Sequence, residues 1–308
     1  MLTIRNSKQK ISLRGVQMHI LLTGGTGFIG KSLTDALLKR GDKVSVWVHK
    51  HRPTHSGVNV IERLEDAKDV DAVVNLAGLP IADRPWSHSR KVALLASRMG
   101  PTGQLVKWMQ SLETPPAVLV SGSAIGYYGA TRASRSITEV DAPLVKDFSS
   151  QLCQEWEDTA QEATKMGVRV CLIRTGIVLG KGGALKKMLP AFKLGLGGPI
   201  VDAKQMMPWI HIDDEVRAIL HLIDQPVLSG AFNLTAPNPV DNQTFTKTLG
   251  TVLNRPTFLP MPKLMVQLML GKEGAALLTE GLKVLPERLQ NSGFTFKYDS
   301  LEDALRAI

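Results

Sequence analysis

The sequence predicts an α/β fold built on a doubly wound parallel sheet, with a smaller C-terminal lobe. Short apolar runs alternate along the chain with longer stretches of helical spacing. This order is typical of parallel strands joined by crossover helices. A glycine-rich turn separates the first apolar run from the first helical stretch. With 308 residues, 44% of them apolar, the chain is long enough for one large domain or two smaller ones.

The first unit begins at Met18 as strand, turn, helix and second strand. HILL at 19–22 predicts a short buried strand, and leucines recur at helical spacing over 33–38. Gly41 follows as the expected C-cap of that helix, and VSVWV at 44–48 predicts the second strand. The length of the segment fits a βαβ unit.

The turn between this strand and helix has the spacing expected of a dinucleotide site. Gly24, Gly27 and Gly30 follow one another at intervals of three. Glycine permits a positive φ and a close approach of the backbone to a pyrophosphate, and the N-terminus of the helix attracts its charge. We therefore predict a Rossmann-type nucleotide site, with a plain strand-to-helix turn as the alternative.

The stretch after the second strand selects between the two nicotinamide dinucleotides. An acidic residue there would bind the adenosine ribose of NAD. The sequence has instead His49, Lys50, His51 and Arg52, with no acid among them. A basic cluster accommodates a 2′-phosphate, so we predict NADP and consider NAD less suited. A solvated loop is the alternative, and no metal site is expected because no carboxylate or cysteine completes one.

Four further segments extend the alternating pattern. DAVVNLAG at 71–78 predicts a buried strand that ends in short side chains, which leave room for a ligand. A helix is expected over 87–111, where Pro101 should kink or break it. AVLV at 117–120 and VRVCLIRTGIVLG at 168–180 predict two more strands.

Several motifs together resemble the extended short-chain dehydrogenase/reductases. They are TGGTGFIG (23–30), NLAG (75–78), SGSAIGYYG (121–129), RTGIVLG (174–180) and PWIHIDD (208–214). LGLGGPI (194–200) and LPERLQNSGFTF (285–296) are more closely similar to bacterial "epimerase family" proteins related to NAD-dependent sugar-nucleotide epimerases. The resemblance runs from Met18 almost to Ile308. It implies a Rossmann domain over 18–190 and a substrate lobe over 191–308, with a soft boundary between them.

The same resemblance implies which residues contact NADP. They lie on the glycine loop, at the ends of the following strands and on the helix at 87–111. They are Thr23, Gly24, Gly27, Phe28, Ile29, Gly30, His49, Lys50, Arg52, Leu76, Ala77, Gly78, Arg98, Arg174 and Val178.

The catalytic residues implied by the resemblance are incomplete. Ser123 stands where the family's serine polarises the substrate oxygen, but Phe148 and Leu152 occupy the positions of its tyrosine and lysine. A free tyrosine has a pKa near ~10, so only about one in a thousand is ionised at pH 7. We assign catalysis to Ser123 with Tyr127 or Tyr128. Alternatively, both tyrosines pack as lids over the cofactor.

Two functions follow from these motifs. The first is an NADP-dependent oxidoreductase or epimerase acting on a small hydroxyl or carbonyl substrate, either free or nucleotide-linked. The second is an NADP-binding sensor or regulator without turnover. The retained Ser123 favours the first function, and the missing tyrosine and lysine favour the second.

Charge and composition limit which binding partners and which cellular compartment we expect. The net charge is +9, but the basic residues are scattered and aromatic residues make up only 5%, so we expect no nucleic acid. No apolar run approaches the ~20 residues needed to cross a bilayer, and we expect no membrane partner. A small-molecule substrate and a homodimer are the expected partners. Cys153 and Cys171 predict buried thiols and a reducing compartment, the cytoplasm.

Two segments carry weaker expectations. Residues 1–17 contain four basic residues and no acid. They could be transit-like, but we interpret them as a leader outside the fold. Met261, Met265 and Met269 recur at helical spacing beside Leu264 and Leu268. Such a stripe usually belongs to the core and sometimes forms a dimer face.

Overall fold

A seven-stranded parallel sheet forms the centre of the protein. The computed structural model describes residues 17–48, 52–53 and 55–308. The strand order is β10-β6-β5-β4-β1-β2-β3, and every neighbouring pair is parallel. This confirms the predicted doubly wound α/β class. The strands are β1 (His19–Thr23), β2 (Lys43–Trp47), β3 (Val58–Ile61), β4 (Ala72–Asn75), β5 (Val118–Ala124), β6 (Arg169–Thr175) and β10 (Gly230–Leu234).

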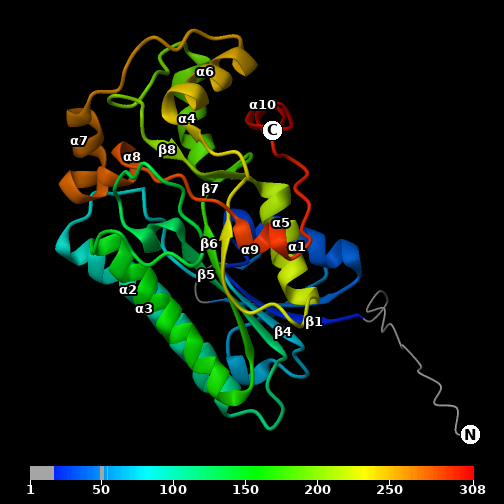
Figure 1. Ribbon diagram of the computed structural model, residues 1–308. Helices are drawn as coiled ribbons and strands as arrows, with labels where there is room; N and C mark the ends of the chain where they lie inside the picture. The colour runs from blue at the N-terminus through cyan, green and yellow to red at the C-terminus, as the bar shows by residue number, and fades with distance from the viewer. Residues whose placement is uncertain (1–16, 49–51, 54) are drawn as a thin grey trace, which may run out of the picture.

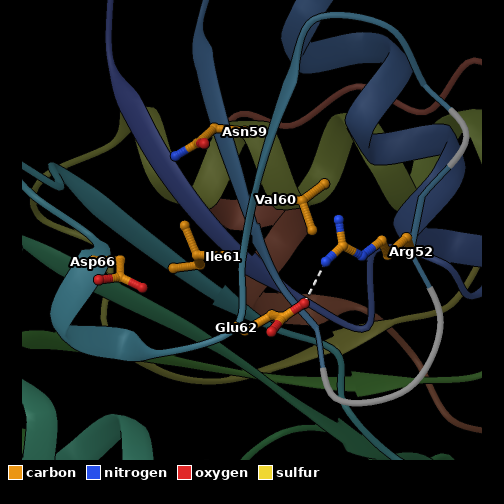
Figure 2. A pocket seen from close by; sticks show the side chains of 6 residues that line it. All are labelled: Arg52, Asn59, Val60, Ile61, Glu62 and Asp66. Atoms are coloured by element: carbon orange, nitrogen blue, oxygen red, sulfur yellow. Dashed lines mark hydrogen bonds and ion pairs between the residues drawn. The ribbon is translucent and has the colours of Figure 1, made fainter.

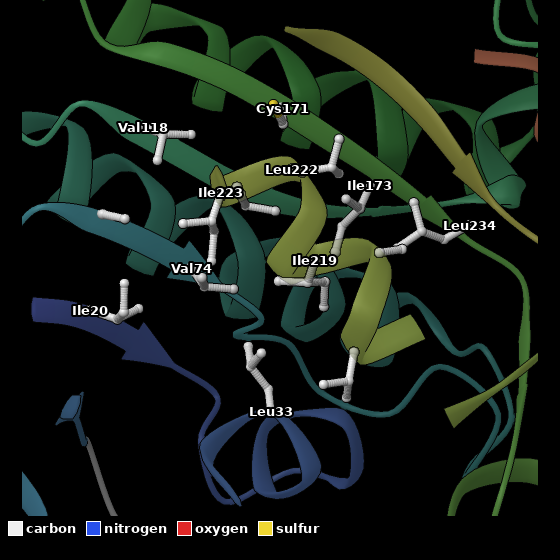
Figure 3. Close-up of a cluster of buried hydrophobic side chains, with 14 of the residues drawn as sticks. Ile20, Leu33, Val74, Val118, Cys171, Ile173, Ile219, Leu222, Ile223 and Leu234 are labelled. Atoms are coloured by element: carbon white, nitrogen blue, oxygen red, sulfur yellow. The ribbon is translucent and has the colours of Figure 1, made fainter. Parts of the chain in front are cut away.

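Helices cover both faces of this sheet. On one face lie α1 (Phe28–Arg40) and α5 (Ile212–Asp224), and on the other α2 (His88–Gln110) and α3 (Phe148–Gln161) (Figure 1). Alternate residues of each strand enter the two cores because successive side chains point to opposite faces. Figure 3 shows the first core, where side chains of α1 and α5 point toward the strands.

Two local predictions concern the C-terminus of α1 and the proline inside α2. Gly41 closes α1 with φ 92°, and its N–H donates to the carbonyls of Leu37 and Leu38, so the predicted C-cap is confirmed. We predicted that Pro101 would kink or break the helix at 87–111, and the break is excluded because α2 continues through Pro101. Leu105 and Met109 anchor the following turns in the core. This packing outweighs the ~3 kcal/mol cost of an internal proline.

The C-terminal lobe is built from small elements around a third core. Its two-stranded sheets pair β7 (Ile177–Leu179) with β9 (Trp209–His211), and β8 (Met206–Met207) with β11 (Val240–Asp241). Its helices are α4 (Gly183–Lys193), α6 (Asn242–Leu253), α7 (Lys263–Gly274), α8 (Ala276–Thr279), α9 (Glu287–Asn291) and α10 (Leu301–Arg306). The chain does not part cleanly at residue 190, since α5 and β10 return to the central sheet.

Short 3-10 helices complete the described elements. They are η1 (Leu64–Asp66), η2 (Ile125–Tyr128) and η3 (Glu162–Met166). Within the described ranges, no helix is long and apolar enough to cross a bilayer. Cys153 and Cys171 are free and buried, as predicted.

The Met/Leu stripe faces outward. Met265 and Leu268 of α7 are exposed, whereas Val266 and Leu270 are buried. The core interpretation of this stripe was therefore wrong. The apolar residues of α7 are distributed all around the helix, so their spacing alone did not show which of its faces would pack against the rest of the protein.

Candidate active site

The glycine loop makes a close backbone contact between β1 and β4. Gly24 has φ 68°, and a Cβ there would lie 2.5 Å from the Leu76 carbonyl oxygen. A Cβ on Gly30 would lie 2.2 Å from the carbonyl oxygen of Gly24, so α1 can approach the loop only through glycine. Gly27 is the N-cap of α1, and no side chain caps this helix within the described structure. Its first backbone N–H groups form a ready anion site.

The side chains of the loop point into the protein. The Phe28 ring packs so closely against Gly180 and Gly182 that a Cβ on either would lie within 2.6 Å of it. Ile29 packs against the core formed by α1 and α5. Phe28 and Ile29 therefore present their backbone, rather than their side chains, to a ligand at this turn.

A buried polar network ties the carboxyl ends of β1 and β4 to each other and to α2. Thr23 Oγ1 donates to Asn75 Oδ1 at 2.7 Å and accepts the N–H groups of Leu76 and Ala77. Asn75 Nδ2 donates to Thr102 Oγ1 of α2 at 2.8 Å. The Thr23 hydroxyl is therefore engaged within the protein and acts by fixing the loop after β4.

Arg98 of α2 lies beside that loop. Its guanidinium donates to the Leu79 carbonyl at 3.2 Å and lies 5.1 Å from the Trp156 ring. Gly78 contacts the same guanidinium, since a Cβ there would lie 3.1 Å from Arg98 Cζ. Burial lowers the pKa of Arg98 from its ordinary value, although an arginine remains charged throughout the physiological range.

The basic stretch after β2 is only partly described. His49 and Lys50 lie outside the described residues, while Arg52 is exposed and forms an ion pair with Glu62. Figure 2 shows Arg52 at the rim of an open hollow lined also by Asn59 and Ile61. This hollow lies along the edge strand β3, away from Ser123 on β5. We therefore do not assign it to the reaction.

Ser123 contacts a buried carboxylate at the end of β5. Its Oγ donates to Glu157 Oε1 of α3 at 2.6 Å. Arg174 of β6 donates to both carboxylate oxygens of Glu157 at 2.8 Å. The side chains of Glu157 and Arg174 are only 6% and 5% exposed. The strand register places Ser123 directly beside Arg174, so the three residues form one compact unit.

Arg174 is held by this unit and by a tyrosine. Burial alone would lower the pKa of Arg174, but the hydrogen bonds and charge of Glu157 outweigh it and raise the pKa above its ordinary value. Its Nη1 also donates to the Tyr128 hydroxyl at 3.0 Å. The predicted cofactor residue Arg174 is therefore engaged mainly inside the protein.

The two tyrosines of η2 have different surroundings. Tyr128 is fully buried and donates to Asn233 Oδ1 at 2.8 Å. Burial raises the pKa of Tyr128 to about 12, although Arg174 acts in the opposite direction. Tyr127 is half-buried, and its ring stacks against the Arg174 guanidinium at 3.4 Å. Of the two tyrosines, only Tyr127 is partly exposed.

Aromatic and apolar side chains occupy the tyrosine and lysine positions. Phe148 packs edge-on against Trp86 with ring centroids 5.1 Å apart, and Lys91 Nζ lies 5.2 Å from the Phe148 ring. Leu152 is buried. Lys91 is therefore a cation beside the position where the family's catalytic tyrosine would stand, although it also pairs with Glu273 of α7.

Metal ligation has no support in the described residues, which contain no group of three or more His, Cys, Asp and Glu side chains able to hold an ion.

Two further residues lie near the start of the C-terminal lobe. His211 is the N-cap of α5, and its ring nitrogen Nδ1 accepts the Asp213 N–H at 3.1 Å. Val178, on β7, is half-buried at the edge of the first core.

Comparison with known proteins agrees with this architecture. The sequence profile of the NAD dependent epimerase/dehydratase family matches residues 20–234, and a domain of unknown function, DUF1731, matches residues 261–308. The chain belongs to the NAD dependent epimerase/dehydratase family. The predicted kinship with epimerase family proteins is thereby confirmed.

Relatives within this family match almost the whole chain. The "Epimerase family protein SDR39U1 homolog, chloroplastic" of Arabidopsis thaliana is 41% identical over 95% of this chain and 87% of its own. The Bacillus subtilis "Epimerase family protein YfhF" is 35% identical over 94% and 97%. The crystal structure of human epimerase family protein SDR39U1 (isoform2) with NADPH has a TM-score of 0.87 and 35% identity, covering 94% of this chain and 99% of that one.

Sequence reasoning missed Glu157 and Asn233. Glu157 lies on the buried side of α3, one residue after Trp156 and three before Ala160. A carboxylate on the apolar face of a helix, together with an arginine inside the apolar strand at 168–175, was the available signal. Buried charges need partners, so each of these residues implied that some oppositely charged side chain lay nearby, without showing which one.

Proposed function

We propose that this epimerase family protein binds NADP(H) and exchanges a hydride with a small hydroxyl or carbonyl substrate, as an oxidoreductase or an epimerase. The observation that carries the proposal is the 2.6 Å contact between Ser123 and Glu157 at the carboxyl end of β5. Ligands of doubly wound sheets bind at this end of the strands. The human relative was crystallised with NADPH, which supports the choice of cofactor.

The residues of this chain fit NADP at two points. The uncapped first turn of α1 and the close glycine contacts at Gly24 and Gly30 suit a pyrophosphate. Arg52, together with His49 and Lys50 of the same basic stretch, suits a 2′-phosphate. When bound, the cofactor supplies the hydride acceptor in its oxidised form and the hydride donor in its reduced form.

Ser123 and Glu157 replace the missing proton-transfer pair. An ionised carboxylate can only accept hydrogen bonds, so Ser123 directs its proton to Glu157 and keeps its lone pairs for a substrate O–H. During alcohol oxidation the substrate proton would pass to Ser123 Oγ while the Ser123 proton moves to Glu157 Oε1. Carbonyl reduction reverses both transfers. Tyr127 completes the substrate contact, because the Tyr128 hydroxyl is bound to Arg174 and Asn233.

An NADP-binding sensor without turnover is the second candidate. One observation favours it: Glu157 forms a bidentate ion pair with Arg174, which engages both carboxylate oxygens within the protein. In a sensor, the Ser123 network would serve only to hold the loop around the cofactor.

Oxidation of NADPH across a panel of carbonyl compounds and sugar nucleotides separates the two candidates. An enzyme should turn over at least one substrate, and Ser123→Ala should lower kcat/KM by roughly 10–1000-fold while NADPH still binds. Tyr127→Phe should lower kcat/KM more than Tyr128→Phe, and Ser111→Ala at the distal end of α2 is the control. Turnover that survives all three site substitutions would refute this assignment. Absence of turnover throughout the panel would favour the sensor.

Calorimetric titration tests the cofactor separately. NADPH should bind at least several-fold more tightly than NADH, because the 2′-phosphate gains charge-assisted hydrogen bonds. Arg52→Ala should reduce this preference without changing NADH affinity. Equal affinities of the wild type for the two dinucleotides would exclude the proposed role of the basic stretch.

A further inference from the structure

The C-terminal lobe carries a concentrated apolar surface. Eight of the fourteen large apolar side chains exposed in the described part of the chain lie within residues 194–196 and 258–269. We call these exposed side chains the apolar ridge. Leu194, Phe258 and Leu268 are 74%, 72% and 68% exposed. Single exposed apolar residues are ordinary, but a cluster of this kind marks an interaction surface.

Backbone hydrogen bonds and packing place the segments that carry the ridge next to one another. The Met261 N–H donates to the Pro199 carbonyl at 2.8 Å, and the Val201 N–H donates to the Met261 carbonyl at 3.0 Å. Ile200 then packs with Val266 on the buried side of α7. The two segments therefore run side by side, and the exposed residues of α7 extend the same surface. In Figure 1, α7 and the loop leading to it from α6 lie along one margin of the molecule.

The two segments that carry the ridge are rich in basic residues. Residues 181–201 contain four lysines and no acid, and residues 254–272 contain Arg255, Lys263 and Lys272, also without an acid. An acid follows each segment directly: Asp202 pairs with Arg132, and Glu273 pairs with Lys91. The surface thus combines leucine, methionine and phenylalanine with a basic border, the combination found on segments that lie in an anionic membrane interface.

We propose that the apolar ridge docks the protein on an anionic lipid surface without spanning it. A second copy of the chain suits the surface less well, because a two-fold interface would place the same basic border against itself. An acidic protein would match the charge, but the ridge lacks the tyrosine and tryptophan anchors typical of protein interfaces. This inference departs from the expected absence of a membrane partner, which rested on the lack of a spanning run.

Cosedimentation with vesicles tests the proposal. The wild type should bind phosphatidylcholine vesicles that contain phosphatidylglycerol, bind vesicles of phosphatidylcholine alone much less, and lose affinity as salt rises. Leu264→Ser/Leu268→Ser should reduce binding by roughly tenfold or more. Val140→Ser/Val227→Ser is the matched control, since these valines are 86% and 83% exposed outside the ridge. Arg255→Glu/Lys263→Glu should also weaken binding, whereas Lys39→Glu/Lys107→Glu, an equal change in net charge, should not.

Four results would overturn the proposal. The first is failure of the wild type to bind anionic vesicles, and the second is equal binding by the ridge variant and its valine control. The third is a dimer in light scattering that Leu264→Ser/Leu268→Ser converts to a monomer, which would assign the ridge to a second copy. Equally tight binding to soluble polyglutamate would assign it to an acidic polypeptide instead. Unchanged melting curves of the variants establish that they fold.

Discussion

Two buried glutamates contact side chains of the same strand, β6, from opposite faces of the sheet. They differ in the number and kind of their partners. Glu157 of α3 receives two hydrogen bonds from Arg174 and one from Ser123. Glu215 of α5 receives one, from the Thr175 hydroxyl at 2.8 Å, and its Oε2 has no partner among the described residues. Arg174 and Thr175 are neighbours on β6, so their side chains point to opposite faces of the sheet.

The difference shows how a partner sets the protonation state of a buried acid. Burial raises the pKa of Glu215 to about 8, opposed only by the Thr175 hydrogen bond. Glu215 is therefore largely protonated at neutral pH. Glu157 is instead compensated by the guanidinium of Arg174, which donates to both of its carboxylate oxygens. Side chains of one strand thus take part in an ion pair on one face of the sheet and contact a neutral acid on the other.

The largest expected effect comes from removing the charge of Glu157. Glu157→Gln leaves Arg174 buried without a counter-charge and should lower the free energy of unfolding by about 3–5 kcal/mol. Urea denaturation measures the loss, and Asp158→Asn, exposed on the same helix, is the control and should stay within about 0.5 kcal/mol. Equal stability of the two variants would show that the pair is not structurally important.

Glu215→Gln should raise the free energy of unfolding above neutral pH, whereas Glu157→Gln lowers it. The pKa of Glu215 is raised in the fold from its usual 4.5 to about 8, so its contribution to stability is complete below pH 4.5 and is lost as pH rises through 8. Glu215→Gln removes this slope and should be more stable than wild type at pH 9 by about 2–4 kcal/mol. Denaturation at a series of pH values tests this. Parallel pH profiles for the variant and the wild type would contradict it.

A smaller effect is expected from Tyr128 at alkaline pH. Its pKa is raised from 10 to about 12, so the fold holds the proton more tightly and stability falls between pH 10 and 12. Tyr128→Phe should abolish this fall while costing about 1–2 kcal/mol at pH 7, because Asn233 loses its donor. Tyr127→Phe should keep the alkaline fall. A fall of equal size in the Tyr128→Phe variant would exclude Tyr128 as its source.

The smallest stability effect belongs to Ser123. Ser123→Ala removes one of the three hydrogen bonds of Glu157 but leaves both from Arg174. We expect a loss of about 1 kcal/mol in unfolding free energy, with NADPH affinity unchanged in calorimetry. A loss as large as that of Glu157→Gln would mean that the serine is chiefly a structural element of the unit.

The sequence alone predicted the α/β class, five strands of the central sheet (those that became β1, β2, β4, β5 and β6), the glycine loop and the C-cap at Gly41. These features depend on residues close together in the chain: the periodicity of apolar side chains, the φ angle that glycine permits and the capping of one helix turn. The missing tyrosine and lysine at Phe148 and Leu152 were also visible, because their positions are defined by a local motif.

Only the tertiary structure decided which distant groups meet. Glu157 and Arg174 are 17 residues apart, and Tyr128 and Asn233 are 105 apart, so no local pattern joins them. Packing likewise carried α2 through Pro101 and left one side of α7 uncovered. Local periodicity states which residues avoid water, but the arrangement of the whole chain decides which faces are covered and which buried charges are paired.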